Sequence, residues 1–227
     1  MTVAPETEDA DQVIEALATS GAVPSLGHTD CSSEQMSAAI DASARALRQH
    51  RSRSTLPTAT HLFNGMRPVH HRDPGPALAA LDAAARGDLL VELIADGVHL
   101  DPRTVAHVFA VAAEDRVLLV TDAMAAAGMA DGQYSLGSLE VTVSDGVATL
   151  TDGGAIAGGT AHLIDVVRCC VQRSGIDLVP AVRAASAVPA RMLGMDDRIG
   201  SITAGLRADL VLPHHDLQGH EGLRGGV

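Results

Sequence analysis

The sequence of 227 residues has no tryptophan, no lysine and only three cysteines. Cys31, Cys169 and Cys170 are odd in number and the last two are adjacent, which excludes a disulfide framework and the paired spacing of a zinc finger. We find no signal peptide and no apolar run long enough to span a bilayer. The sequence therefore predicts a cytoplasmic protein in a reducing compartment, with no membrane partner.

Basic residues are also scarce. All 16 are arginine, and against 28 acidic residues they leave a formal net charge of −12. Nucleic-acid binding needs a basic face that neutralises phosphates, so this balance argues against a nucleic-acid partner. The overall field also repels an anionic substrate, which must then be met by locally placed arginine or histidine side chains.

Short apolar runs alternate with alanine-rich stretches over the first 120 residues. We expect strands at 22–26, 58–63, 89–95 and 117–120, and helices at 33–49, 75–86 and 102–113. This alternation predicts parallel βαβ units and hence an α/β fold. The pattern then changes, and we expect a hairpin at 133–150 turning at Asp145-Gly146, helices at 161–174 and 178–193, a strand at 208–212 and a glycine-rich end at 218–227.

Each predicted parallel strand ends in polar residues that could carry chemistry. The four strands run, in order, into His28, into His61 and Asn64, into Asp96 and His99, and into Asp122. In a (β/α)8 barrel the catalytic groups lie at these carboxyl ends, around one mouth. Two imidazoles suit zinc, and an aspartate on a later strand could transfer protons. The pattern predicts metal-assisted hydrolysis of an amide.

Each candidate also has a simpler interpretation. A single histidine at a strand end is more often exposed or hydrogen-bonded than a ligand. The aspartate after the fourth strand could cap the next helix, and Arg72 could be a solvated loop charge. We interpret His70 and His71 as structural, and His214 and His215 likewise. The prediction therefore depends on the combination of residues.

Short motifs along residues 3–212 connect these candidates. They are GHT (27–29), THLFNGM (60–66), HRDPG (71–75), DGVH (96–99), VTDA (120–123), IAGG (156–159) and ADLV (208–211). The series resembles the N-acetylglucosamine-6-phosphate deacetylases of the amidohydrolase superfamily. The run around His61 and Arg72 is specific to the deacetylases, whereas the terminal motif is shared across the superfamily.

The resemblance implies the chemistry of the site. His28 and His61 would be ligands of a divalent metal, zinc in the first place and iron as the alternative. Asp122 would be the catalytic acid/base. The reaction would release acetate and glucosamine 6-phosphate from N-acetylglucosamine 6-phosphate, a step of amino-sugar catabolism.

The resemblance also implies how the amino-sugar phosphate is bound. Arg72 would pair with the 6-phosphate, for which the fork of a guanidinium is well shaped. Arg72 and His99 can serve the neighbouring subunit's site in this family, so we expect a homodimer when the protein has its full length. The residues implied in substrate binding are Asn64, Gly65, Arg72, His99, Ile156, Ala157 and Gly158.

A barrel with a small β-sandwich built from both chain ends is the implied fold. Residues 3–6 resemble the end of a mid-barrel strand. We therefore expect residues 1–195 to form an incomplete (β/α)8 metallohydrolase barrel, about strands four or five to eight, with the hairpin near 133–150 as an insertion. Residues 196–227 would form the C-terminal strand segment of the sandwich and a tail. Such a half-barrel leaves two open parallel edges.

Some parts of the family's site have no counterpart in this sequence. These are a metal-binding glutamate in a Glu-Gly-Pro motif, a His-x-His pair and one substrate-contacting histidine. Glu6 is no substitute by motif and stays unassigned. Two alternatives remain open: another amidohydrolase, such as one similar to a dihydroorotase, and a non-catalytic fragment. The Arg72 loop favours a phosphorylated substrate over the former, while the absent glutamate favours the latter for the isolated chain.

Overall fold

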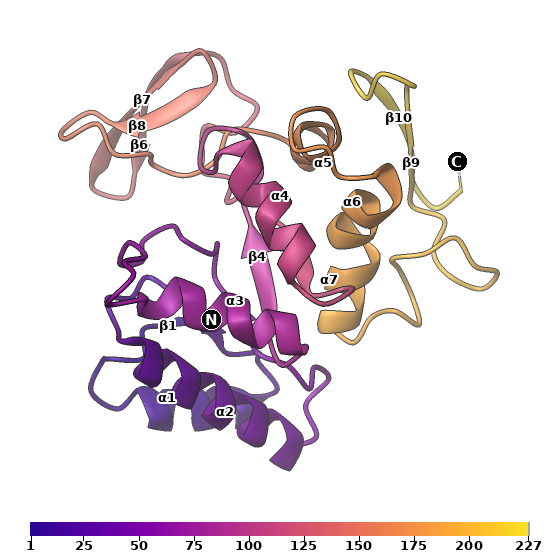
Figure 1. The fold of residues 1–227 in the computed structure, drawn as a ribbon. Coiled ribbons are helices and arrows are strands. Elements are labelled where there is room, and N and C mark those ends of the chain that lie inside the picture. The colour runs from indigo at the N-terminus through magenta and orange to yellow at the C-terminus, as the bar shows by residue number, and fades with distance from the viewer. Residues whose placement is uncertain (227) are drawn as a thin grey trace.

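A computed structural model describes residues 1–226 of the protein (Figure 1). The helices are α1 (Ala10–Ser20), α2 (Ser33–Gln49), α3 (Gly75–Arg86), α4 (Pro102–Val111), α5 (Leu163–Gln172), α6 (Leu178–Ala185) and α7 (Ala187–Met192). The strands are β1 (Thr2–Val3), β2 (Ser25–Leu26), β3 (Thr58–Ala59), β4 (Leu90–Leu93), β5 (Val117–Leu119), β6 (Gly132–Leu136), β7 (Leu139–Ser144), β8 (Val147–Leu150), β9 (Leu210–Pro213) and β10 (His220–Leu223).

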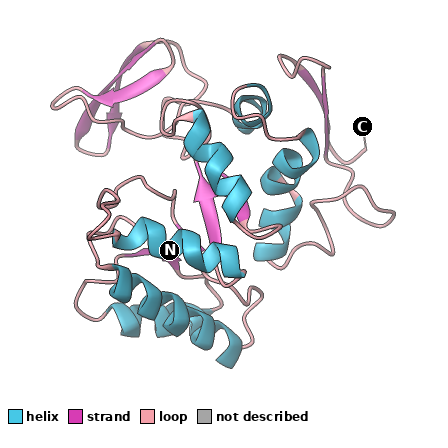
Figure 2. Ribbon diagram, in the orientation of Figure 1, coloured by secondary structure: helices cyan, strands magenta, loops and turns pink. Residues whose placement is uncertain are grey.

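The first five strands form one parallel sheet in the order β1-β2-β3-β4-β5, so the predicted α/β fold is confirmed. Leu26 pairs with Val3 on one side and Ala59 on the other, and Val91 continues the row. Connections between parallel neighbours are right-handed, which places the crossover helices on one face of the sheet. Consecutive helices from α1 to α5 pack against one another around this face (Figures 1 and 2).

Small side chains let the helices of this layer approach closely. Ala39 and Ala46 on α2 are buried, as are Ala80 and Ala83 on α3, and the two helices pack together. Alanine is also the strongest helix former, so the same residues favour the helices and their contact. The core beneath is correspondingly built from alanine, valine and leucine.

Side chains on the other face of the sheet form a polar network, unlike the bulky apolar filling of most barrel interiors. Thr58 Oγ1 lies 2.8 Å from Glu92 Oε1 and 2.6 Å from Ser25 Oγ. Ser25 Oγ in turn lies 2.5 Å from Thr60 Oγ1. Because Ser25 and Thr58 are buried, these bonds satisfy hydroxyls that would otherwise be costly to bury.

The region predicted as a hairpin is a three-stranded antiparallel meander, β6-β7-β8. The expected turn at Asp145-Gly146 is present between β7 and β8. A second tight turn, with Gly137 at φ +61°, joins β6 to β7. Glycine adopts this left-handed conformation without the steric cost paid by other residues. The meander stands apart from the parallel sheet (Figure 1).

Three further expectations need correction. The helix predicted at 178–193 is two helices, because Ser186 at φ −137° and ψ −69° interrupts it. Pro189, which has no N–H to donate, lies in the first turn of α7, where a helix tolerates proline. The glycine-rich end contains β10, which pairs with β9. Helix α1 was not predicted, although Ile14 and Ala18 bury one of its faces.

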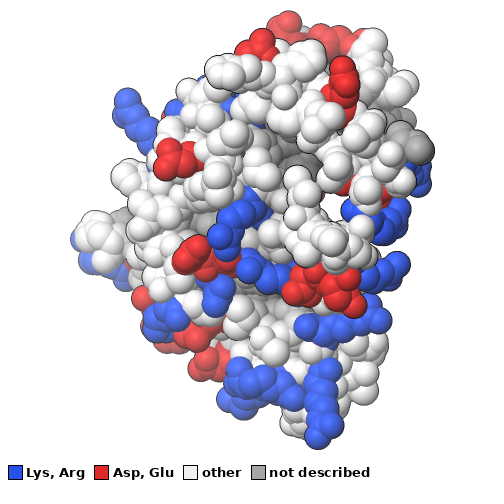
Figure 3. Space-filling view, turned by 90° about the vertical axis from the view of Figure 1, so that its right-hand side faces the viewer, with Lys and Arg blue, Asp and Glu red and all other residues white. Residues whose placement is uncertain are grey.

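Acidic and arginine side chains lie beside one another across the middle of the face shown in Figure 3, several arginines gather at its lower end, and most of the remaining surface is uncharged. In the part of the chain that is described, no helix combines the length and the apolar character needed to cross a membrane.

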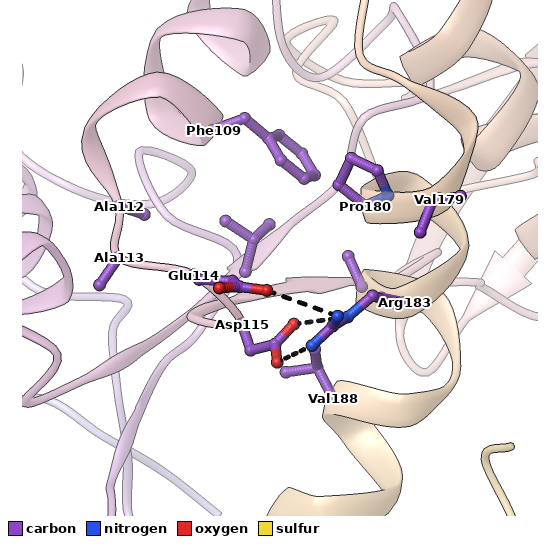
Figure 4. Close-up of a pocket in the computed structure, with 11 residues that line it drawn as sticks. Phe109, Ala112, Ala113, Glu114, Asp115, Val179, Pro180, Arg183 and Val188 are labelled. Atoms are coloured by element: carbon purple, nitrogen blue, oxygen red, sulfur yellow. Dashed lines mark hydrogen bonds and ion pairs between the residues drawn. The ribbon is translucent and has the colours of Figure 1, made fainter.

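An ionic cluster ties the C-terminal helices to the sheet (Figure 4). Asp115, between α4 and β5, accepts from Arg183 Nε at 2.9 Å and pairs with Arg191 Nη2 at 2.6 Å. The side chain of Asp115 is 16% exposed, and it borders a cavity of about 430 Å³ lined by Phe109 and Val188 among others. Partial burial alone would raise the pKa of Asp115, but the hydrogen bonds from both guanidinium groups outweigh it and hold the pKa below its usual value.

We predict that Asp115→Asn lowers the free energy of unfolding by about 1–3 kcal/mol at pH 7, because charge-assisted hydrogen bonds are lost. The pKa of Asp115 is lower in the folded state, so its contribution is present above the unfolded value of about 3.9 and is lost as the pH falls through the folded pKa. The difference between wild type and variant should therefore shrink at acid pH. Urea unfolding across pH measures it.

Glu114→Gln is the matched control for this change. Glu114 is the neighbouring acid and meets the same Arg183, but at 3.4 Å and with a side chain 84% exposed. Exposed ion pairs contribute little, so this variant should unfold like wild type. Equal effects of the two substitutions would show that Asp115 has no special part in holding α6 and α7.

Candidate functional site

Three of the predicted site residues leave their strands through left-handed backbone. His28 follows β2 at φ +50°, His61 follows β3 at φ +28°, and Asp122 follows β5 at φ +49°. Residues with a Cβ avoid this region because of steric clash, at a cost of order 1–3 kcal/mol each. Such strain persists only where the surrounding structure imposes it, and it clusters at functional sites. Six other non-glycine residues within residues 1–226 share this conformation, Asp9 and Leu217 among them, so the backbone agrees with these candidates but does not single them out.

His28 and His61 face each other directly. Their Nε2 atoms lie 2.8 Å apart, and the ring centroids lie 4.6 Å apart with the planes at 70°. His61 is buried and His28 is exposed. Two imidazoles on a tetrahedral zinc, at the usual bond length, hold their nitrogens about 3.4 Å apart. A small movement of either ring would therefore let both nitrogens bind one ion.

The pair fits two ligands of a divalent metal, and the described residues add no third. Within residues 1–226 no group of three His, Cys, Asp or Glu side chains is arranged to hold an ion. Asp122 therefore stands outside ligand reach of the histidine pair. The buried Nδ1 of His61 has no hydrogen-bond partner among these residues, although metal-bound histidines usually donate from that nitrogen.

Glu6 serves a different purpose, which agrees with leaving it unassigned. Its carboxylate accepts a hydrogen bond from the Thr29 hydroxyl and another from the Asp30 N–H at 2.8 Å. Partial burial would raise the pKa of Glu6, but these hydrogen bonds outweigh it and hold the pKa below its ordinary value. The ionised carboxylate ties the loop after β1 to the loop after β2.

The loop after β3 is built against His28. A Cβ on Gly65, which has φ +60°, would lie 3.0 Å from His28 Nδ1, so glycine lets the backbone pass the ring. The Gly65 carbonyl accepts from the Thr29 N–H at 2.9 Å. The Asn64 amide donates to the His61 carbonyl at 3.1 Å. Asn64 therefore holds this turn, and its side-chain oxygen remains for a ligand.

Arg72 lies at the tip of a tight turn that extends from the same loop. The turn closes through two backbone hydrogen bonds between His70 and Asp73, at 3.0 and 3.2 Å. Arg72 is exposed, and its Nη1 donates to His71 Nε2 at 2.8 Å. Among residues 1–226 it forms no ion pair with a carboxylate. Its charge therefore remains available to an anion.

Arg67 organises this loop, and sequence reasoning missed it. Its guanidinium donates from Nε to Asp30 Oδ1 and from Nη1 to Asp73 Oδ2, both at 2.8 Å. Hydrogen bonds to these two carboxylates raise the pKa of Arg67. The two acids are distant in sequence, so no local pattern could have paired them. Arg67 pins the turn that carries Arg72 to the loop after β2.

His99 and Asp96 form a buried pair after β4, with both side chains 6% exposed. Asp96 Oδ2 accepts from His99 Nδ1 at 2.8 Å, and Oδ1 accepts from the N–H groups of Val98 and His99. Burial would raise the pKa of Asp96, but these hydrogen bonds outweigh it and lower the pKa. The carboxylate can only accept, so Nδ1 carries the proton and Nε2 is the remaining ring nitrogen.

The segment after the meander returns to Asp122. The Gly159 N–H donates to the Asp122 carbonyl at 2.7 Å, which brings the predicted pocket residues beside the predicted acid/base. Ile156 is exposed and Ala157 is buried. The Asp122 residue itself is exposed. The chain after the meander is therefore held beside Asp122.

The amidohydrolase family profile matches residues 20–219 of this chain. The chain belongs to the amidohydrolase family. Amidohydrolases generally depend on a divalent metal, which agrees with the histidine pair. The relatives of this amidohydrolase chain, described next, confirm its resemblance to the amino-sugar-phosphate deacetylases.

Curated relatives and solved structures agree on the kind of enzyme. An N-acetylgalactosamine-6-phosphate deacetylase from Escherichia coli O157:H7 is 40% identical over 92% of this chain and 51% of its own length. The N-acetylglucosamine-6-phosphate deacetylase of Bacillus subtilis is 34% identical over 96% and 51%. A mutant of the Mycobacterium smegmatis N-acetylglucosamine-6-phosphate deacetylase, in complex with N-acetylglucosamine 6-phosphate, matches with a TM-score of 0.87 and 40% identity, over 99% of this chain and 56% of that one. This amidohydrolase chain spans about half the length of these relatives.

We predict that Asp96→Asn changes the proton position on the His99 ring. The asparagine oxygen can still accept from the backbone N–H groups, but its NH₂ group is a donor and cannot accept the hydrogen bond from His99 Nδ1. The ring should then lose its preference for a protonated Nδ1, and the variant should be less stable by about 1–3 kcal/mol. Nitrogen-15 NMR of the imidazole reads the tautomer directly.

Asp101→Asn is the control, because Asp101 is a nearby acid that caps α4 through the Arg103 N–H and does not contact His99. It should leave the His99 ring spectrum as in wild type. An unchanged spectrum in Asp96→Asn would show that Asp96 does not set the tautomer.

Proposed function

We propose that this chain provides the catalytic and substrate-binding residues for metal-dependent removal of the N-acetyl group from N-acetylglucosamine 6-phosphate. The observation that carries the proposal is the His28–His61 pair, whose Nε2 atoms lie 2.8 Å apart at the ends of adjacent parallel strands. The motif series around the pair, and relatives that are named as deacetylases of amino-sugar phosphates, support this substrate class.

The fold proposed for this function is a partial (β/α)8 barrel. Strands β1 to β5 would be about the last four or five barrel strands, within residues 1–195. Their sequential parallel order and the row of helices outside them support this interpretation. Residues 196–227 would supply a strand segment of a small sandwich, for which the β9–β10 pair is the candidate.

His28 and His61 would hold the divalent ion, zinc in the first place and iron as the alternative. When bound, this ion would polarise the amide carbonyl and stabilise the negative charge that develops on its oxygen. Glu6 and Asp122 are not available as further ligands in this geometry, because Glu6 is hydrogen-bonded elsewhere and Asp122 forms no ligand group with the two histidines among residues 1–226. The remaining ligands would come from outside the described residues.

Asp122 would move the protons of the reaction. As a carboxylate it would accept a proton from the attacking water, and it would then return that proton to the departing amine of the sugar. Its exposed position after β5 leaves the carboxylate accessible to a substrate. Amide hydrolysis needs this second step, since an amine leaves much more readily once protonated.

Substrate binding would use residues near the histidine pair as well as residues beside Asp122. Arg72 would meet the 6-phosphate, because its exposed guanidinium has no carboxylate partner within residues 1–226 and could bind two phosphate oxygens. His99 would offer Nε2 to the sugar or phosphate, because Nδ1 is held by Asp96. As in the resemblance, Arg72 and His99 would serve a neighbouring subunit of a homodimer. The remaining proposed contacts are Asn64, Gly65, Ile156, Ala157 and Gly158.

The galactosamine epimer is a second candidate substrate. Two curated relatives named for N-acetylgalactosamine 6-phosphate deacetylation, one of them a putative assignment, are 40% and 43% identical to this chain, and the glucosamine enzymes of Mycobacterium smegmatis and Bacillus subtilis are 40% and 34% identical, so identity does not separate the two substrates. The two sugars differ only in configuration at C4. Acetate release from each phosphorylated sugar, measured side by side, decides between them. Release from neither would favour the non-catalytic alternative.

We predict that the isolated chain retains less than one zinc per molecule after dialysis, because two imidazole ligands hold the ion weakly. His61→Ala should abolish the remaining zinc. His214→Ala is the control and should retain the wild-type amount, since His214 lies in the tract that we interpret as incidental. Elemental analysis measures all three. One tightly held ion per wild-type chain, or zinc retained by His61→Ala, would contradict the proposed ligands.

We predict that Asp122→Asn lowers kcat for acetate release by about 10²–10⁴-fold, because asparagine fits the space but cannot transfer a proton. Zinc content and KM should stay near wild type. Asp152→Asn, an exposed acid after β8, is the control and should keep full turnover. Near-normal turnover in Asp122→Asn would show that the base lies elsewhere. Loss of zinc would make Asp122 a ligand.

A further inference from the structure

The meander has a hydrophobic core of its own, separate from that of the parallel sheet. Val141 and Val143 on β7 and Ala148 on β8 are buried in it. The same core includes Met124, which follows Asp122 closely, and Ala157, which follows the meander. The meander core therefore holds the chain that follows Asp122 and the segment that returns to it at Gly159.

Hydrogen bonds lead from the meander to Asp122. The Ala157 N–H donates to the Ala148 carbonyl at 2.9 Å, which fixes the segment after β8 alongside that strand. Two residues later, Gly159 forms a parallel bridge with Ala123. The Gly159 N–H donates to the Asp122 carbonyl at 2.7 Å, and the Met124 N–H donates to the Gly159 carbonyl at 3.0 Å. Gly159 thus bonds the backbone on both sides of Ala123.

The approach at Gly159 is too close for any side chain. A Cβ built there would lie 1.9 Å from the Thr121 carbonyl oxygen and 3.4 Å from the Asp122 carbonyl oxygen. Both are backbone atoms, so neither can rotate away as the end of a side chain could. The φ of Gly159 is not in the left-handed region, so the need for glycine arises from space alone.

We propose that Gly159 is a positioning residue for Asp122, and that the meander is the support that holds it in place. Asp122 is kept at φ +49° although it has a Cβ, so something must hold it in that strained state. The two hydrogen bonds and the tight contact at Gly159 supply that constraint. This inference rests on the proposed role of Asp122, but the constraint on its backbone can be tested without activity.

Gly159→Ala and Gly132→Ala are a matched pair for the test. Both glycines lack a left-handed φ, and both belong to the meander or the segment that follows it. A Cβ at Gly132 would meet only Tyr134 side-chain atoms, the nearest at 3.8 Å, which is ordinary contact. The two substitutions therefore differ in whether the new methyl group meets the backbone next to Asp122.

Amide hydrogen exchange in the purified chain is the first measurement. In wild type and Gly132→Ala, the amides of residues 124 and 159 should be protected. In Gly159→Ala both should exchange at least 10-fold faster, because the added methyl group separates the two segments by about 1 Å or more. Protection of both amides in Gly159→Ala, equal to wild type, would overturn the inference.

Val141→Ala is the second variant, in case Gly159→Ala does not fold. Val141 is fully buried in the meander core and lies outside the Asp122 contact. Loosening this core should speed exchange at residues 124 and 159 while amides of α2 and α3 keep their protection. Unchanged exchange at those two amides would show that the meander does not support Asp122.

Acetate release from N-acetylglucosamine 6-phosphate is measured on the same samples with zinc added. Gly159→Ala should lose about 100-fold in kcat with KM kept within twofold, since displacement of a catalytic group by 1 Å can cost that much. Normal turnover in Gly159→Ala would also overturn the inference. A wild-type chain that releases no acetate counts against activity of the chain by itself, and the exchange results then decide the positioning role alone.

Discussion

Close approach of backbone segments at the strand ends is the constraint on which the candidate site depends. A Cβ on Gly65 would lie 3.0 Å from the His28 ring, which is tighter than ordinary contact, and a Cβ on Gly159 would lie 1.9 Å from the Thr121 carbonyl oxygen, which is too close. His28 and Asp122, next to these glycines, both lie in the left-handed region of the backbone. The strain is sustained because separate hydrophobic cores hold the segments on either side.

Charge pairing completes the arrangement without contributing to the site directly. Asp96 holds the His99 ring, and Arg67 joins the loops after β2 and β3. Asp115 joins the C-terminal helices α6 and α7 to the start of β5, at the end opposite Asp122. These contacts differ in kind, because Arg67 lies between two acids, Asp115 lies between two arginines, and Asp96 pairs with a histidine. Arg72 is one of many exposed arginines that form no ion pair within residues 1–226, and its place in the turn that follows β3 is what makes it the candidate for an anionic ligand.

Sequence reasoning predicted the elements whose signals are local. Helices α2 and α3 have the predicted bounds to the residue, since α2 begins with a capping box at Ser32 and α3 ends at Gly87 with φ +85°. The break at Ser186 and the clamp made by Arg67 depend on tertiary contacts and left no local signal. Helix α1 could have been found from its apolar spacing.

The site shows the same division between local and distant information. The motifs predicted that His28 and His61 would lie together, and the structure brings them together. The motifs could not show that Asn64 donates to its own turn or that Gly159 bonds the backbone around Asp122, because both depend on the path of the chain after the strand ends. The meander in particular was predicted as an insertion, with no indication that it reaches the site.

The single tyrosine makes the fluorescence of this protein a reporter of the meander. Tyr134 lies in the meander, packs against its core and donates to the Ala130 carbonyl at 2.5 Å, and the chain has no tryptophan. Tyrosine emission from the whole protein therefore originates in the meander. Circular dichroism, by contrast, is dominated by the helices around the parallel sheet. Comparing the two signals during heating separates melting of the meander from melting of the sheet, without any label.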